Sequence, residues 1–146
     1  MNTDTVILEF DIGTTEPNAK LGVRALIDGT VFHENSHVTE TYHVAHEISD
    51  SDNDHVLEIE LYGKRHEHTE VNETGDIVQD ALITVTNIQL DDIDVAQLSQ
   101  QLFAYHHDFN GTQPLTVDKF YGSLGCNGTI KLKFTTPIYL WLLENM

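Results

Sequence analysis

Apolar and polar residues alternate along most of the chain with a period of two, the spacing that places every second side chain on one face of a β-strand. The clearest case is residues 55–62, where Leu57, Ile59 and Leu61 alternate with charged or aromatic neighbours. Similar alternation predicts further strands over residues 6–12, 21–27, 30–33, 38–48, 81–90 and 130–134. We therefore expect the β-strand to be the dominant secondary structure.

Segments rich in turn-forming residues separate these strands. Asp28-Gly29 predicts a tight hairpin, because both residue types tolerate the positive φ that a two-residue turn requires. Residues 49–54 have the composition of a turn. Residues 63–76 form a polar stretch that is too long for a tight turn, and we treat it as a candidate functional loop.

One short helix is expected, over residues 94–103 with Asp94 as its N-cap. Residues 105–127 have the pattern of a polar connector. About eight short strands with one minor helix and no βαβ rhythm predict an all-β domain. We expect a two-sheet β-sandwich or jelly roll in which residues 1–146 form a single domain.

The apolar run at residues 138–143 predicts a last strand that is hydrophobic on both faces. One face would join the core, and the other needs cover from the helix or from a second subunit. A central strand buried within the monomer is the alternative. The residues expected at such an interface are Ile138, Leu140, Trp141 and Leu142.

Charge narrows the classes of partner. The chain has 24 acidic and 7 basic residues, for a formal net charge of -17. Such a surface repels nucleic acid and anionic membranes, but it suits divalent cations or a basic partner surface. No apolar run reaches the ~18 residues of a membrane span. With a single cysteine, Cys126, the chain has no intramolecular disulfide.

His66-Glu67-His68, followed by Glu73, is the sharpest metal-binding pattern in the sequence. If these residues lie on a strand, His66 and His68 share a face, and Glu73 could supply a third ligand. The spacing matches half of the cupin metal motif, which raises the alternative of a metal-dependent enzyme. An exposed polar loop with incidental histidines is the other interpretation. The sequence contains none of the common catalytic motifs, so we expect a non-enzymatic protein.

Three segments resemble calcium-dependent xylan-binding-type carbohydrate-binding modules. They are residues 27–29, 55–59 and 80–88, which correspond to a Val-Asp-Gly hairpin, a His-x-Val-x-Ile strand and an Asp-x-x-Leu-x-Val-x-x-Ile segment. The resemblance spans about residues 20–95 and implies a β-sandwich.

The same resemblance implies a calcium site built from an Asn-Asp pair after the second strand and from the later aspartate. Here Asp80 matches the later aspartate, whereas Gly63-Lys64 stands where the pair belongs. Glu73 or Asp76 from the same loop could substitute as a calcium ligand. Calcium is the cofactor that this interpretation requires.

The whole chain also resembles small structural proteins of marine tailed phages, cyanophages in particular. The likeness lies in a His-Asp-Phe-Asn-Gly-Thr segment at 107–112, a Lys-Phe-Tyr-Gly segment at 119–122 and the tail at 134–145. It implies a virion protein that decorates the capsid or sits on the tail. The partners would be other virion proteins or further copies of the chain, and the location the virion, after synthesis in the host cytoplasm.

We therefore expect first a virion structural protein with a carbohydrate-binding-module-like fold. The alternative is a calcium-assisted glycan-binding module, with its site in the 63–80 region and Tyr62 as a stacking platform for a surface glycan. A cupin-type enzyme is the second alternative.

Overall fold

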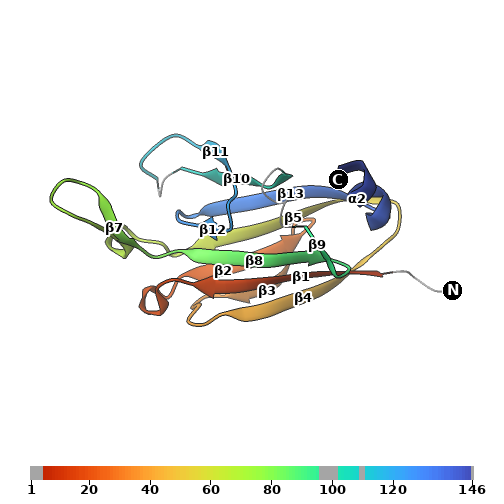
Figure 1. The fold of residues 1–146 in the computed structure, drawn as a ribbon, viewed down its shortest axis with the longest axis horizontal. Helices are drawn as coiled ribbons and strands as arrows, with labels where there is room; N and C mark the ends of the chain where they lie inside the picture. Colours follow the sequence, from red (N-terminus) through yellow and green to blue (C-terminus); the bar gives the residue numbers. More distant parts are fainter. Residues whose placement is uncertain (1–4, 96–101, 109–110, 146) are drawn as a thin grey trace.

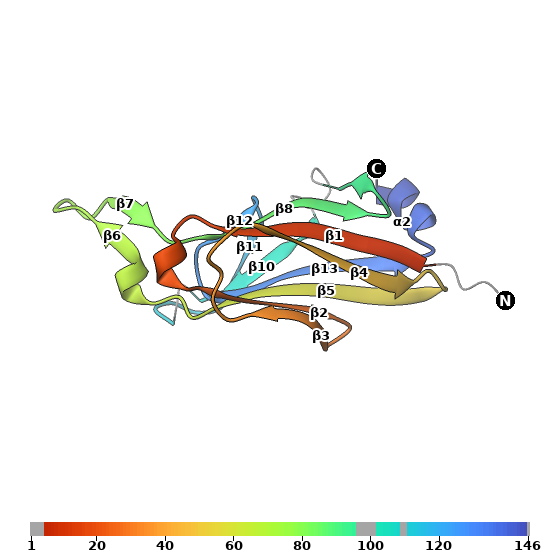
Figure 2. The same ribbon diagram turned by 90° about the horizontal axis from the view of Figure 1, so that it is seen from below.

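Two antiparallel sheets stack face to face in the computed structural model, which describes residues 5–95, 102–108 and 111–145 (Figure 1, Figure 2). The first sheet has the order β12-β8-β1-β4, with β9 paired to β8. Its strands are β1 (Thr5–Thr14), β4 (Tyr42–Ser49), β8 (Ile83–Leu90), β9 (Ile93–Asp94) and β12 (Ser123–Leu124).

The second sheet has the order β11-β10-β13-β5-β2-β3. Its strands are β2 (Gly22–Ile27), β3 (Thr30–Asn35), β5 (Asn53–Tyr62), β10 (Ala104–His107), β11 (Thr116–Lys119) and β13 (Gly128–Thr136). A 3₁₀ turn, η1 (Pro17–Ala19), lies between β1 and β2. The prediction of a two-sheet β-sandwich is confirmed.

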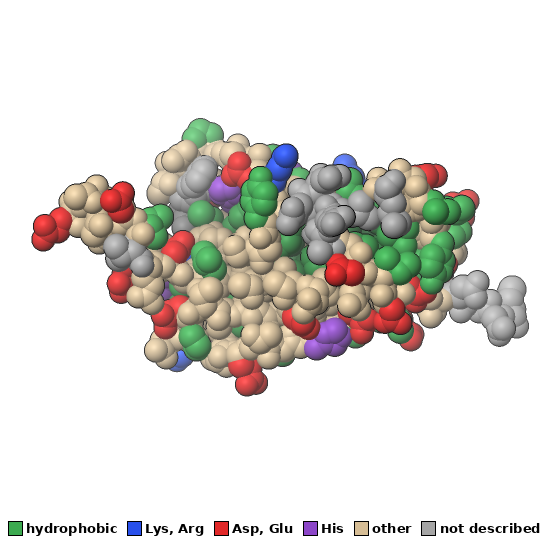
Figure 3. Space-filling model, viewed as in Figure 1, with side chains coloured by type: hydrophobic (Ala, Val, Ile, Leu, Met, Phe, Trp, Pro, Cys, Tyr) green, Lys and Arg blue, Asp and Glu red, His purple; other side chains and the backbone are tan. Residues whose placement is uncertain are grey.

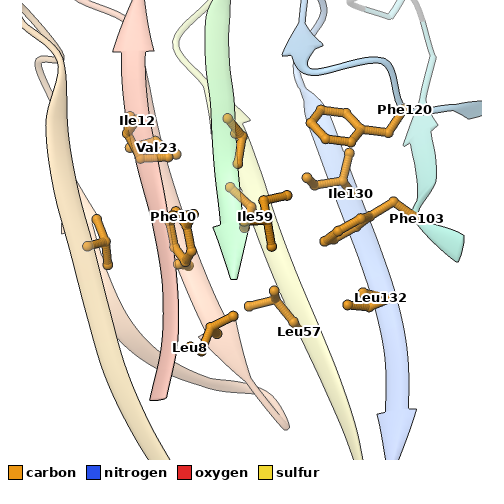
Figure 4. Packing of buried hydrophobic residues seen from close by; sticks show 14 of the residues in the cluster. Leu8, Phe10, Ile12, Val23, Leu57, Ile59, Phe103, Phe120, Ile130 and Leu132 are labelled. Carbon is orange, nitrogen blue, oxygen red and sulfur yellow. The ribbon is translucent and has the colours of Figure 1, made fainter. Parts of the chain in front are cut away.

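The core lies between the two sheets and is built from the alternating residues that the sequence pattern singles out (Figure 4). Leu8, Phe10 and Ile12 of β1 are fully buried, as are Leu57 and Ile59 of β5. Each such side chain stabilises the fold by roughly 1.5–3 kcal/mol relative to an exposed position. This burial of apolar side chains from both inner faces holds the two sheets together.

The hairpin between β2 and β3 has the predicted turn. Asp28 and Gly29 have φ of 51° and 83°, the conformation of a type I′ turn. The Asp28 carboxylate also accepts a hydrogen bond of 2.8 Å from the Val56 backbone N–H. The turn residue therefore fastens the hairpin to the neighbouring strand β5.

The candidate loop after β5 is folded. It contains a 3₁₀ turn, η2 (His66–His68), and two strands, β6 (Thr69–Val71) and β7 (Ile77–Asp80), which form their own two-stranded sheet. Figures 1 and 2 show this hairpin projecting beyond one end of the sandwich. We call residues 66–80 the arm.

The predicted last strand is wrong, because residues Ile138–Asn145 form helix α2. The helix follows Pro137, and its first N–H, on Ile138, donates to the Asp50 carboxylate at 2.7 Å. Ile138, Trp141 and Leu142 follow helical spacing and are buried in the chain's own core. Of the four expected interface residues, only Leu140 is exposed.

Two other sequence predictions concern the segment after β9. Most of the predicted helix, residues 94–103, lies outside the described residues, and Asp94 closes β9. The predicted connector over residues 105–127 instead contains most of β10, all of β11 and all of β12. These strands escape a pattern search because each has only two to four residues. Within the described residues, no helix is long and apolar enough to cross a membrane.

A close approach between β13 and β10 leads to the first prediction. A Cβ atom on Gly128 would lie 2.4 Å from the His106 carbonyl oxygen and 2.8 Å from the His107 Cβ. We expect Gly128→Ala to lower the free energy of unfolding by about 1–3 kcal/mol, because backbone must shift to make room. Urea denaturation measures the change.

Gly125→Ala is the matched control. A Cβ atom there would approach the end of the Leu82 side chain at 3.1 Å, and that end can move. We expect a loss below about 1 kcal/mol. Equal losses in the two variants would contradict the assigned approach of β13 to β10.

Candidate functional site

A groove of about 420 Å³ lies beside the short strands β10, β11 and β12. We call it the Tyr121 groove, after its most exposed aromatic residue. Its lining residues are Tyr105, His107, Asp118, Lys119, Tyr121 and Ser123. The groove thus combines aromatic rings, a carboxylate, an ammonium, an imidazole and a hydroxyl.

Strand pairing sets the position of the polar side chains in the groove. In the β10–β11 ladder, Tyr105 is the register partner of Asp118. The Asp118 carboxylate lies 2.6 Å from His107 Nε2, and the His107 side chain is almost completely buried. The rings of Tyr105 and His107 lie 4.5 Å apart at 35°. The imidazole therefore holds the half-exposed carboxylate of Asp118 at the groove surface.

Tyr121 provides an exposed aromatic surface next to this pair. The residue is 71% exposed and precedes Gly122, whose φ of 100° turns the chain toward β12. Leu115 and Val117 are exposed nearby in sequence. An exposed ring beside hydrogen-bonding side chains can stack on an apolar ring face of a ligand while the polar groups fix its orientation.

The hydroxyl of Tyr105, a residue that lines the groove, holds the backbone of Cys126. This hydroxyl accepts a hydrogen bond from the Cys126 backbone N–H at 2.9 Å and donates one to the Cys126 carbonyl. Burial raises the pKa of the Tyr105 hydroxyl, and it also raises the pKa of the Cys126 thiol. A thiol with a raised pKa is a poor nucleophile at neutral pH.

Near Cys126, a buried lysine joins three segments of the chain. The Lys64 side chain is 0% exposed, and its Nζ donates to Asp80 Oδ1 at 2.5 Å, to the Gly125 carbonyl at 2.9 Å and to the Ala81 carbonyl. Thr69 Oγ1 donates to the same Asp80 oxygen at 2.6 Å. We call Lys64, Asp80, Ala81, Gly125 and Thr69 the Lys64 cluster.

Asn127 fixes the backbone of Lys64. Its Oδ1 accepts from the Lys64 N–H at 2.8 Å, and its Nδ2 donates to the Lys64 carbonyl at 2.9 Å. The lysine is therefore held at both its backbone and its ammonium. Since Asn127 and Gly125 belong to the segment that also carries Ser123 and Cys126, the cluster supports the wall of the Tyr121 groove.

The three residues predicted as calcium ligands do not come together. Asp80 lies at the root of the arm in the Lys64 cluster, whereas Glu73 and Asp76 lie at its tip, about 13 Å away at the rise of an extended strand. His66 and His68 lie in a 3₁₀ turn, η2, and not on the strand that the prediction assumed. In the described part of the chain, no group of three His, Cys, Asp or Glu side chains could hold a metal ion.

Tyr62, the expected stacking platform, already has internal partners. Its ring lies over Gly22, and the Arg24 guanidinium carbon is 4.9 Å from the ring centroid. Its hydroxyl donates to Glu34 at 2.8 Å. These contacts place Tyr62 in a surface ion-pair cluster of the second sheet.

The residues of the Tyr121 groove are absent from the sequence-based site prediction. Its short strands lie in a segment whose polar composition is typical of a connector. The one available signal is alternation in residues 116–119, where Val117 and Lys119 alternate with Thr116 and Asp118. Four residues are too few to separate a strand from a loop.

Comparison with known proteins identifies the fold. No protein-family model matches the chain, and no curated protein sequence matches it. The chain is similar to a solved structure, the selenomethionine form of vCBM60. The description of that structure states that circular permutation provides an evolutionary link between two families of calcium-dependent carbohydrate-binding modules. The match has a TM-score of 0.51 and 10% sequence identity, and it covers 87% of this chain and 89% of that one. The chain therefore has a carbohydrate-binding-module-like β-sandwich fold.

The double hydrogen bond of Tyr105 leads to the second prediction. Tyr105→Phe removes a hydroxyl that pairs both the N–H and the carbonyl of Cys126. We expect the free energy of unfolding to fall by about 1–3 kcal/mol, because two partly buried backbone groups lose their partner. Chemical denaturation provides the measurement.

Tyr121→Phe is the matched control, since its side chain is exposed. We expect it to change stability by less than about 0.5 kcal/mol. If Tyr105→Phe proves as neutral as this control, the hydroxyl of Tyr105 does not stabilise the backbone at Cys126.

Proposed function

We propose that the protein is a non-enzymatic carbohydrate-binding module and that it binds a glycan in the Tyr121 groove. The observation that carries the proposal is the exposed ring of Tyr121 beside the ordered His107–Asp118 pair. The carbohydrate-binding-module-like fold supports it.

The chemistry of the groove suits a sugar. A pyranose ring presents an apolar face of C–H groups and a rim of hydroxyls. Tyr121 offers a flat apolar surface to the ring face, while Asp118 accepts from hydroxyls and Lys119 and Ser123 donate to them. A groove of about 420 Å³ is at the small end of ligand sites, so a short glycan segment and weak binding are expected.

The lining residues also argue for binding without hydrolysis. Most glycoside hydrolases use a pair of carboxylates on either side of the scissile bond. Among the described residues that line the groove, Asp118 alone has a carboxylate, and His107 engages it at 2.6 Å.

A glycan panel tests this function. We expect wild-type protein to bind at least one glycan and Tyr121→Ala to weaken that binding by about tenfold or more, because the ring loses its apolar contact. Calorimetric titration with the best glycan gives the ratio of dissociation constants.

Tyr139→Ala is the matched control. Tyr139 is a half-exposed tyrosine on α2, away from the groove, and its loss should leave glycan affinity unchanged. Binding that survives in Tyr121→Ala, or a panel without any ligand, would rule out the groove as a glycan site.

A second candidate function, a structural role in a phage particle, is favoured by the outer face of α2. Leu140 and Leu143 are 59% and 74% exposed, and Tyr139 lies beside them. Figure 3 shows hydrophobic side chains gathered at the α2 end of the molecule, next to acidic ones. Together with the whole-chain resemblance to phage proteins, this patch supports docking on another virion protein.

The partner for this surface would be apolar with a basic rim. Asp91 accepts a hydrogen bond of 2.6 Å from the Tyr139 hydroxyl, and Asp50 and Asp92 are close enough to raise the pKa of Tyr139 further. Two copies of the chain would each bring a net charge of -17 to their contact. A basic surface of another virion protein therefore fits better than a second copy.

Particle incorporation tests the second function. We expect the double variant Leu140→Ser, Leu143→Ser to fold normally, since both side chains are exposed, but to lower the copy number on purified particles by about tenfold. Leu115→Ser, at another exposed leucine, is the control and should be incorporated like wild type. Incorporation of the double variant at the wild-type level would contradict docking through α2.

A further inference from the structure

We propose that the Lys64 cluster is a cation site whose cation belongs to the chain itself, namely the ammonium of Lys64. It follows that the protein holds this end of the sandwich without calcium. A second consequence, which rests on the proposed carbohydrate-binding function, is that the glycan is also bound without calcium.

The oxygens of the cluster form the kind of site that proteins use for cations. One carboxylate oxygen and two backbone carbonyls converge on Nζ, which has three N–H donors and uses all of them. Nothing of the Lys64 side chain is exposed. A buried charge is tolerated only when it is paired and hydrogen-bonded, and this ammonium is both.

A divalent ion has no room beside this ammonium. Calcium takes six to eight oxygen ligands, several of them carboxylates, whereas the cluster has the single carboxylate of Asp80. The contacting oxygen of Asp80 already accepts from Thr69 as well as from Lys64. A calcium ion on the same oxygens would lie next to a like charge in a buried site, where the repulsion is strong.

The location of the cluster explains why a cation is needed there at all. Lys64 follows β5, Asp80 and Ala81 join β7 to β8, and Gly125 lies between β12 and β13. The ammonium thus ties a strand end of each main sheet to the root of the arm. A metal ion could in principle join the same segments, but the residues present do not fit one.

The first experiment measures calcium dependence directly on the wild-type protein. We expect the melting temperature in about 5 mM CaCl₂ to differ by less than about 1 °C from that in EDTA at matched ionic strength. MgCl₂ controls for ions that associate loosely with the acidic surface. A calcium-specific rise of several degrees that disappears in Asp80→Asn would overturn the proposal.

The second experiment removes the ammonium. Lys64→Met keeps much of the side-chain volume but leaves Asp80 without its charged partner, so we expect the melting temperature to fall by roughly 10 °C or more. Lys64→Ala opens space for propylammonium, which equals the missing part of the side chain beyond Cβ. We expect propylammonium chloride to raise the melting temperature of Lys64→Ala but not of Lys64→Met.

Tetramethylammonium chloride, which has no N–H donor, controls for ionic strength. If Lys64→Met melts at the wild-type temperature, the ammonium does not have the proposed role. The same conclusion follows if the two salts change the melting temperature of Lys64→Ala equally. If Lys64→Ala does not fold, the Lys64→Met and calcium measurements decide.

These stability measurements need no glycan, so their outcome does not depend on whether the proposed function is correct. With a glycan in hand, EDTA should leave its dissociation constant unchanged, and a loss of affinity in EDTA would overturn the second consequence.

Discussion

The buried ammonium of Lys64 is the constraint on which one whole end of the molecule depends. Removing a charge from water is costly, and the fold compensates only because three acceptors from two segments, residues 80–81 and Gly125, converge on a single atom. These acceptors lie at or just after the ends of β7 and β12, so the ammonium, just after β5, ties the ends of three strands together. Ser123, which lines the Tyr121 groove, lies in the same segment as Gly125 and Asn127, so the cluster also helps to place that side of the groove.

The two surfaces proposed for binding are compatible with each other. Strands β11 and β12, which carry part of the Tyr121 groove, lie toward the arm end of the sandwich, whereas helix α2 lies at the opposite end (Figure 1). A partner on α2 would therefore leave the other end of the molecule accessible. A small groove binds weakly, and an array of copies on a particle raises the effective affinity for a surface that carries many glycans.

The sandwich could be predicted from the sequence because its long strands keep strict alternation, as in residues 55–62, where every second side chain enters the core. Helix α2 could not, since residues 138–143 are apolar all round and periodicity cannot separate a strand from a helix in so short a run. The structure shows that the Asp50 cap, distant in sequence, meets the first turn of α2. Tertiary context of this kind is invisible to local patterns.

The site shows the same limit. Resemblance singled out Asp80 and noted the lysine at position 64, but only the fold reveals that the two side chains face each other. The expected ligand set of His66, His68 and Glu73 assumed a strand, and a 3₁₀ turn stands in its place. Tyr121 has no local signal, because its exposure results from the packing of strands too short to recognise.

The arm has a consequence for how the molecule opens. Since β6 and β7 form their own two-stranded sheet, their backbone hydrogen bonds can break while both main sheets stay intact. Asp80 stands at the boundary: its backbone closes the arm, and its side chain belongs to the buried cluster. We therefore expect amide hydrogen exchange in the arm to follow a local opening that ends at this residue, and exchange in β5 and β13 to follow global unfolding. On this view one aspartate marks the border between two cooperative units of the same small domain.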